Sequence, residues 1–287
     1  MFLDHVGWFV SDMDEAGAAF ARLGFPLTPL TVHRNEDEAG NRVPTGTANR
    51  CAMLGRGYLE ILTDVEGLDT PFSRAHLAAV DRYEGLHLIA FSVDDVAAEA
   101  RRLDAEGFGP QPVANLRRPM PVDGGGEEEA GFSVLRVLPG TMAEGRMQIL
   151  RHETPDVVWQ PSTIARDNGV FGLSGVVICT DDPAEAADRY ARFTGRGHEG
   201  ARIVLDRGSL DFVTPAGLAR AIPAARPPSL PFIAAAILES PDLTVTWRFF
   251  KAAGVPVEAL SDGVIAVAPE FAMGAWLVVR AAGMGWP

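Results

Sequence analysis

Apolar and polar positions along the chain repeat in blocks. Apolar residues alternate with others over Leu3–Val10, and this run ends shortly before Asp12. An alanine-rich segment follows in which apolar residues recur at helical spacing, and it stops at Gly24-Phe25. The same order of strand, aspartate, helix and Gly-Phe stop recurs from Leu86 to Phe108. Internal repetition of this kind indicates a fold assembled from copies of one supersecondary unit.

Two further copies start at Leu173 and, more weakly, at Phe232. After each helix of the first two copies we expect three more strands. In the first copy the last two of these strands are Thr47–Gly55 and Gly57–Asp64, which a tight Gly-Arg-Gly turn joins as a hairpin. Each unit therefore follows a βαβββ order, and the hairpins of the C-terminal copies are shorter.

The repeat pattern is interrupted between Glu153 and Gly169 by a stretch rich in Pro, Trp and polar residues. We therefore predict an N-terminal domain over residues 1–160, with modules at 1–66 and 84–155. A degenerate C-terminal domain over residues 170–287 would hold two shortened modules. Because the N-terminal half is the more complete copy, we expect the chemistry to lie there.

Composition narrows the classes of partner. The chain has 287 residues and a formal net charge of -13, which argues against nucleic acid and anionic membrane surfaces because both need clustered Lys and Arg. No stretch approaches the roughly 18 apolar residues of a membrane helix. Cys51 and Cys179 both fall in apolar runs, as buried reduced thiols do. We expect a soluble, cytoplasmic protein whose partner is a small molecule.

Strand parity picks out a charged residue in the last strand of the first unit. Glu60 lies between Leu59 and Ile61 and shares a face with Tyr58. A carboxylate buried there has to be hydrogen-bonded, paired or metal-bound, because burying it alone costs several kcal/mol. In the second unit the aligned position is Gln148.

The first strands of both units carry a histidine. His5 lies seven residues before Asp12, and His87 lies seven residues before Asp94. If the repeats are aligned by their Gly-Phe stops instead, Asp95 matches Asp12 and Leu88 takes the place of His87. We prefer the histidine register, because helix lengths vary more easily than strand parity.

The strings LDHVGWFVSDMDEAGAAFARLGF, LHLIAFSVDD, GTANRCAMLGRGYLEIL and HETPDVVW together resemble the vicinal oxygen chelate superfamily, in its glyoxalase-like branch. This is the fold of glyoxalases, bleomycin resistance proteins and dihydroxybiphenyl dioxygenases. The resemblance implies an α+β protein in which tandem βαβββ modules pair into curled mixed sheets that form cups, with helices outside. It covers the first two units well, the third in outline and the fourth faintly.

The resemblance also implies a divalent metal (Zn, Mn, Ni or Fe) in the N-terminal cup. Its ligands would be His5, Glu60, His87 and Gln148, with Gln148 standing where the family commonly has Glu. His152 shares the face of Gln148 and is a reserve donor. Glu60 is also the candidate catalytic group that moves a proton.

The predicted substrate-binding residues are Asn49, Arg50, Tyr58 and Arg118. Arginines hold anions by bidentate hydrogen bonds, although a surface ion pair is the plainer interpretation of each. The remaining histidines, His33, His76 and His198, have no evident convergent partner.

Three hypotheses for function follow. The first is a metal-dependent isomerase, lyase or dioxygenase that binds two neighbouring oxygens of a small substrate. A dioxygenase would use His5, His87 and Glu60 around iron. The second is a metal-free protein that sequesters an aromatic or antibiotic-like molecule. The third is a degenerate scaffold that serves for pairing, within one chain or in a homodimer.

Overall fold

The computed structural model describes residues 1–36, 41–284 and 286. The N-terminal half contains β1 (Phe2–Phe9), α1 (Met13–Arg22), β2 (Thr31–Glu36), β3 (Arg42–Met53), β4 (Tyr58–Asp64), α2 (Pro71–Arg82), β5 (Gly85–Ser92), α3 (Val96–Ala105), β6 (Ala114–Pro121), β7 (Glu127–Arg136), β8 (Arg146–His152) and α4 (Pro155–Val158). The C-terminal half contains β9 (Gly172–Cys179), α5 (Pro183–Thr194), β10 (His198–Glu199), β11 (Arg202–Val204), β12 (Ser209–Val213), α6 (Pro215–Ala221), β13 (Phe232–Ser240), α7 (Leu243–Ala252), β14 (Glu258–Ser261), β15 (Val264–Val267), a 3₁₀ turn (Pro269–Phe271) and β16 (Trp276–Ala281).

An aspartate caps the helix of every repeat. The side chains of Asp12, Asp95, Asp182 and Asp242 accept hydrogen bonds from backbone N–H groups in the first turns of α1, α3, α5 and α7. Such a cap is worth about 1 kcal/mol and fixes where the helix begins.

These caps show that the preferred histidine register was wrong. Asp95 matches Asp12, so the residue seven positions earlier, equivalent to His5, is Leu88. Strand pairing gives the same answer: Gly7 lies opposite Glu60 in the β1–β4 pair, and Ala90 lies opposite Gln148 in the β5–β8 pair.

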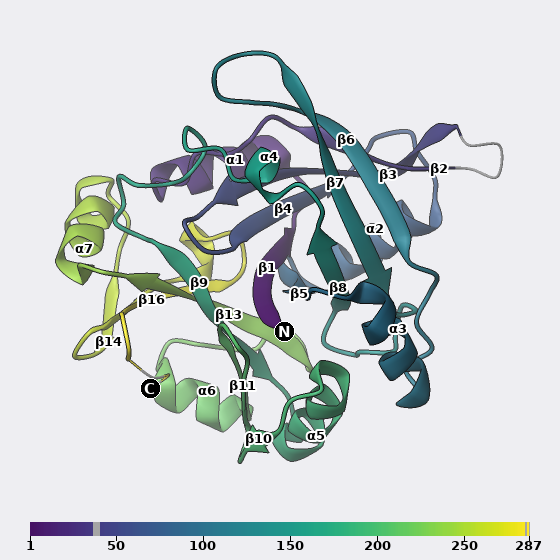
Figure 1. The fold of residues 1–287 in the computed structure, drawn as a ribbon. Helices are drawn as coiled ribbons and strands as arrows, with labels where there is room; N and C mark the ends of the chain where they lie inside the picture. The colour runs from purple at the N-terminus through teal and green to yellow at the C-terminus, as the bar shows by residue number, and fades with distance from the viewer. Residues whose placement is uncertain (37–40, 285, 287) are drawn as a thin grey trace.

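The sixteen strands described form one open mixed sheet network, as the predicted α+β fold class requires. Within each half the first strands of two modules lie side by side and antiparallel, β1 with β5 and β9 with β13. Each first strand is parallel to the last strand of its own module, as β1 is to β4. Figure 1 shows α1, α3, α5 and α7 at the periphery of the curled sheet. The expectation of paired modules with helices outside is therefore confirmed.

A single large hydrophobic core connects the two halves. Trp8, Phe20, Tyr190 and Phe250 are all completely buried in it. The indole N–H of Trp8 donates to the carbonyl of Ala272, 2.9 Å away and in the other half of the chain. Because this core is shared, independent folding of the predicted domains 1–160 and 170–287 stays a prediction.

The two halves differ in the length of their strands. In the N-terminal half β3 has 12 residues and β7 has 10, whereas β11 has three and β15 four. The long strands arch over the upper part of the molecule in Figure 1.

Cys51 and Cys179 are both free and buried. In the described part of the chain, no helix has both the length and the apolar character needed to cross a membrane.

Candidate functional site

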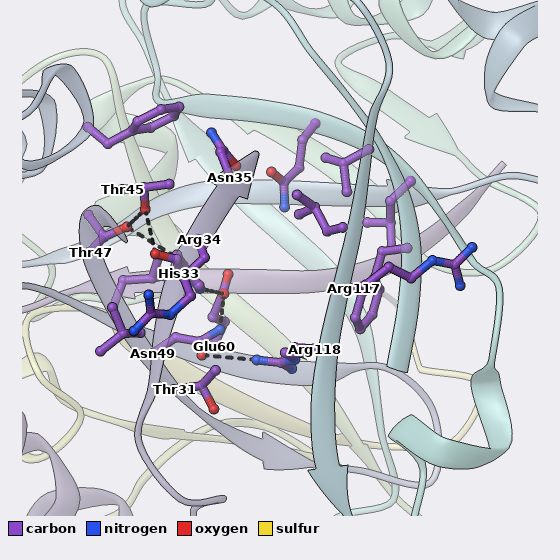
Figure 2. A pocket seen from close by; sticks show the side chains of 18 of the residues that line it. Thr31, His33, Arg34, Asn35, Thr45, Thr47, Asn49, Glu60, Arg117 and Arg118 are labelled. Atoms are coloured by element: carbon purple, nitrogen blue, oxygen red, sulfur yellow. Dashed lines mark hydrogen bonds and ion pairs between the residues drawn. The ribbon is translucent and has the colours of Figure 1, made fainter. Parts of the chain in front are cut away.

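The N-terminal half encloses a cavity of about 510 Å³. Side chains from β1, β2, β3, β4 and the β6–β8 hairpins line it, and Figure 2 shows many of them converging on its interior. Of the residues predicted for the site, His5, Asn49, Tyr58, Glu60, Arg118 and Gln148 line this cavity.

The imidazole of His5 is held by the residue before it. The pairing of β1 with β5 shifts register between Leu3 and His5, which leaves Asp4 out of the ladder and lets two successive side chains interact. His5 Nδ1 lies 2.7 Å from Asp4 Oδ1, and His152 Nε2 lies 3.1 Å from Asp4 Oδ2. A carboxylate only accepts, so both imidazoles donate to it. His5 Nε2 is thereby left as the nitrogen available to the cavity.

Asp4 is ionised in this arrangement. Its side chain is 2% exposed, and although burial opposes ionisation, the hydrogen bonds from His152 and His5 hold the pKa of this carboxyl well below its usual range. An ionised orienting carboxylate fixes the tautomer of the imidazole and the orientation of its ring.

The carboxylate of Glu60 faces His5 from the middle of β4. Its Oε2 lies 3.6 Å from His5 Nε2, and its Oε1 accepts a hydrogen bond of 2.5 Å from Asn49 Nδ2. His33 Nε2 lies 3.8 Å from Oε1. Burial opposes the charge on Glu60, but attraction to His5 and His33 and the bond from Asn49 keep its pKa below the usual value. Glu60 is therefore ionised at neutral pH.

Gln148 completes a group of three donors. Its Nε2 lies 3.2 Å from His5 Nε2, and a half-turn of the amide would present the carbonyl oxygen at the same place. A cation with bonds of about 2.0–2.2 Å holds neighbouring ligands roughly 3.0–3.5 Å apart, which these separations approach. Within residues 1–36, 41–284 and 286, no three His, Cys, Asp or Glu side chains gather closely enough to hold a metal. The donor set therefore fits a divalent cation only with the amide included.

His87 does not belong to this group. It is absent from the cavity lining, its Nε2 lies 2.8 Å from the carbonyl oxygen of Tyr83, and its ring stacks on Tyr83 with centroids 4.0 Å apart. Burial lowers the pKa of His87 to about 4. Its expected role as a ligand is contradicted by this placement, because strand parity brings its neighbour Leu88 to the cavity. The iron triad of His5, His87 and Glu60 is not assembled.

The predicted substrate-binding residues divide in the same way. Tyr58 stacks on His5 with ring centroids 4.2 Å apart, and Arg118 Nη1 donates to Asn49 Oδ1 at 3.5 Å, as drawn in Figure 2. Arg50 does not line the cavity: it lies on the other face of β3, and its Nε donates to the carbonyl of Thr28 at 2.9 Å. The structure therefore gives Arg50 a structural contact rather than a place at the substrate.

Four residues of the site were not predicted from sequence as parts of it. They are Asp4, His33, Arg136 and Arg146, and of these Asp4 and His33 touch the central histidine and glutamate. The expectation that His33 has no convergent partner was wrong. Its position follows from the β2–β3 pairing, which contains a register shift between Val32 and Arg34 that alternation alone does not reveal. Burial lowers the pKa of His33 to about 4 despite the nearby Glu60, so its ring is neutral at pH 7.

The fold has counterparts among solved structures. A hypothetical protein from Staphylococcus aureus matches with a TM-score of 0.65 at 10% identity, covering 97% of this chain and 98% of that one. A mutant of 4-hydroxymandelate synthase from Streptomyces coelicolor matches with a TM-score of 0.57 at 15% identity, covering 99% and 94%. A xylose isomerase-like TIM barrel/4-hydroxyphenylpyruvate dioxygenase fusion protein matches with a TM-score of 0.55 at 14% identity, covering all of this chain and 49% of that one. At these identities the likeness shows the fold alone.

Sequence comparison identifies the family. No curated protein matches the chain. A family model described as a glyoxalase-like domain matches residues 3–194, which include both N-terminal modules and the start of the third. The chain therefore belongs to the glyoxalase-like domain family, within the vicinal oxygen chelate superfamily that its repeats resemble.

Proposed function

We propose that the chain is an enzyme that acts on a small oxygen-bearing substrate in the N-terminal cavity, with a divalent cation (Zn, Mn, Ni or Fe) held by His5, Glu60 and Gln148. The observation that carries this proposal is the imidazole of His5, oriented by Asp4 and separated by 3.6 Å from Glu60 and 3.2 Å from Gln148. A carboxylate–imidazole pair of this kind is the usual support of a metal-binding histidine.

The cation would supply Lewis acidity to two neighbouring oxygens of the substrate. The remaining work falls to side chains of the chain itself. Glu60, ionised and held by Asn49, is positioned to accept a proton from the polarised carbon. Tyr58 keeps the ring of His5 in place by stacking. Isomerase, lyase and dioxygenase chemistry all fit this arrangement, and the fold neighbours named for a synthase and a dioxygenase leave that choice open.

Cation binding tests the proposal directly. Protein purified without a His tag and stripped with a chelator should bind one of Zn²⁺, Mn²⁺, Ni²⁺ or Fe²⁺ near stoichiometrically, as measured by mass spectrometry of bound metal and by calorimetry. Glu60→Gln should weaken binding at least 100-fold. The matched control is Asp211→Asn, at the equivalent position of the third module, which should bind as the unaltered protein does. Absence of binding by all four ions contradicts the proposal.

A metal-free binding protein is the rival, and one observation favours it. Leu88 stands where a second first-strand imidazole would complete a stronger donor set. In that case a bound aromatic molecule would keep its affinity in the presence of a chelator and in Glu60→Gln. Either way we expect a cytoplasmic protein with a small-molecule partner. Loss of all ligand binding in Glu60→Gln excludes the scaffold hypothesis.

A further inference from the structure

Two arginines stand beside the donor group without an acidic partner. In the β7–β8 pair Arg136 lies opposite Gln148, and Arg146 is two residues from Gln148 on the same face of β8. Both line the cavity. Their guanidinium carbons lie 5.9 and 6.0 Å from the centroid of the Phe72 ring, so both groups lie beside one aromatic side chain. Arg146 also lies 5.2 Å from the centroid of Phe9.

Two other arginines of the cavity, Arg42 and Arg117, do have a carboxylate nearby. At the rim Arg42 and Arg117 lie 3.6 and 4.0 Å from carboxylate oxygens of Glu129. No carboxylate in the described part of the chain comes within 4 Å of Arg136 or Arg146. Arg118 also has no carboxylate within 4 Å among the described residues, and its Nη1 donates to the amide oxygen of Asn49, so Arg136 and Arg146 are distinguished by their place beside Gln148.

Charge around the centre is positive as a result. Arg118, Arg136 and Arg146 contribute three positive charges, while Asp4 and Glu60 contribute two negative charges. The oxygens of Glu60 already face Asn49, His5 and His33. Burial and repulsion by Arg136 lower the pKa of Arg146 to about 10, so both side chains remain charged at neutral pH. Like charges held together away from bulk water are unfavourable unless an anion joins them.

We propose that Arg136 and Arg146 form an anion subsite, and that the substrate is a small organic acid whose carboxylate binds there. This inference rests on the proposed function, since it takes the same cavity as the site of reaction. Arginine suits the role because its planar donors match a carboxylate bidentately. Phe72 carries no carboxylate or carbonyl in its side chain, so its contact with the two guanidinium groups leaves their N–H donors available for such bonds.

The distance between subsite and donors limits the size of the acid. Two residues along a strand span about 6.6 Å, so a carboxylate at Arg146 lies a few bonds from atoms beside Gln148. A cavity of about 510 Å³ holds a molecule of that length. The substrate would therefore carry its anionic group on a short carbon chain, at a distance from its pair of neighbouring oxygens.

A matched pair of ligands tests the subsite. 2-Oxoglutarate and its 5-methyl ester share the same neighbouring oxygens and differ only at the distal end, where the ester carries a methyl group in place of the negative charge. Calorimetry on the full chain should show 2-oxoglutarate binding at least tenfold more tightly than the ester. Arg146→Gln and Arg136→Gln should each remove this preference, and Arg146→Lys should keep part of it. Arg151→Gln, which removes an exposed arginine of the same strand, should change nothing. Circular dichroism confirms that each variant is folded.

The outcomes separate this inference from the proposed function. Equal affinity for acid and ester, with binding of both lost in Glu60→Gln, overturns the subsite and leaves the proposed function standing. Acid binding that depends on Arg146 but not on a cation or Glu60 supports the subsite and contradicts the proposed function. Inorganic phosphate that binds through Arg146 while neither organic ligand does overturns the carboxylate assignment, as does the absence of binding by every probe.

Discussion

The two halves of the molecule use one scaffold, yet their centres are built from opposite kinds of side chain. By register, the third module places Gly175 and Asp211 where the first has His5 and Glu60. The fourth module places Trp276 and Val278 where the second has Arg146 and Gln148. Every polar donor of the N-terminal group except one carboxylate is therefore replaced by an apolar residue or by glycine. The scaffold is repeated, and the chemistry is not.

The C-terminal centre is filled rather than hollow. Val177, Trp276 and Val278 pack there with Leu218 and Ile222 around α6 in a buried apolar cluster. The surviving carboxylate, Asp211, is 3.3 Å from Arg202, and burial raises its pKa. A recess of about 340 Å³ remains beside β9 and β12, lined in part by Arg202, Glu239 and Arg280 and also by Arg56 of the N-terminal half. The strands β11 and β15 are too short to enclose a cavity in the C-terminal half as β3 and β7 do in the N-terminal half.

The largest effect we predict comes from a pair of truncations at equivalent positions. Trp276→Ala should lower the free energy of unfolding by about 3–5 kcal/mol, because it leaves a void in a core that buries the indole almost completely. Arg146→Ala should change it by less than about 1 kcal/mol, since removing one of two repelling charges offsets the lost packing. Chemical denaturation measures both. Equal destabilisation would contradict the division into a structural and a functional centre.

Asp4 in the first module is equivalent to Ser174 in the third, so Asp4→Ser introduces the residue that the C-terminal half has at this position. His5 would lose the acceptor that orients its ring, and removal of such a partner weakens metal affinity about 10–100-fold. Calorimetric titration with the preferred cation measures this. Because Asp4 acts through His5, the pH at which half the cation is released should also move upward. A weaker affinity with an unchanged pH profile would indicate a purely structural role for Asp4.

The buried histidines of the N-terminal half make its stability depend on pH. His87 has a pKa of about 4 in the folded chain and about 6.5 when unfolded. As pH falls below 6.5 the unfolded chain takes up a proton that the folded chain refuses, so stability is lost on acidification and the loss is complete near pH 4. Between pH 7 and pH 5 this histidine alone should account for about 2 kcal/mol.

His87→Gln isolates this contribution. The unaltered protein should lose about 2 kcal/mol more than the variant when denaturation curves at pH 7 and pH 5 are compared. His198, which is exposed in the C-terminal half, supplies the contrast through His198→Gln. Hydrogen bonds to the carbonyl of Gly200 and to Asp188 raise the pKa of this ring, so any difference should have the opposite sign. Cation binding should be unaffected by His87→Gln, because this ring lies outside the cavity. A lost cation site would restore His87 as a ligand.

The repeat pattern was sufficient to predict the fold and three side chains that meet in the cavity, but not the residues around them. Alternation placed His5, Glu60 and Gln148 on faces that meet, because period and pairing are set locally. Where the ladder shifts register, at Asp4 and beside His33, side chains turn in a direction that alternation does not encode. Those two positions were accordingly missed.

The preference for His87 failed for a related reason. Two aspartates, Asp94 and Asp95, follow β5, the first strand of the second module. Only Asp95 caps α3. The cap decides which residue is equivalent to His5, and a slip of one position turns the side chain to the other face. Arg136 and Arg146 were not predicted as an anion subsite because their shared neighbour Phe72 comes from α2, which lies between the two predicted modules.

The smallest effect we predict concerns Gln148, which stands where the resemblance to the superfamily implies a glutamate. Gln148→Glu would replace a neutral donor by a charged one, which by itself strengthens binding of a hard cation. It would also place a second carboxylate beside Glu60, where two like charges resist ionisation together. Arg136 and Arg146 lie next to position 148 and would attract the new carboxylate toward themselves. We therefore expect cation affinity to rise only a few-fold while acid binding falls, because the introduced group competes for the anion subsite. Parallel titrations with the cation and with 2-oxoglutarate measure both changes. A large gain in cation affinity with undiminished acid binding would mean that the arginine pair and the donor group are independent of each other.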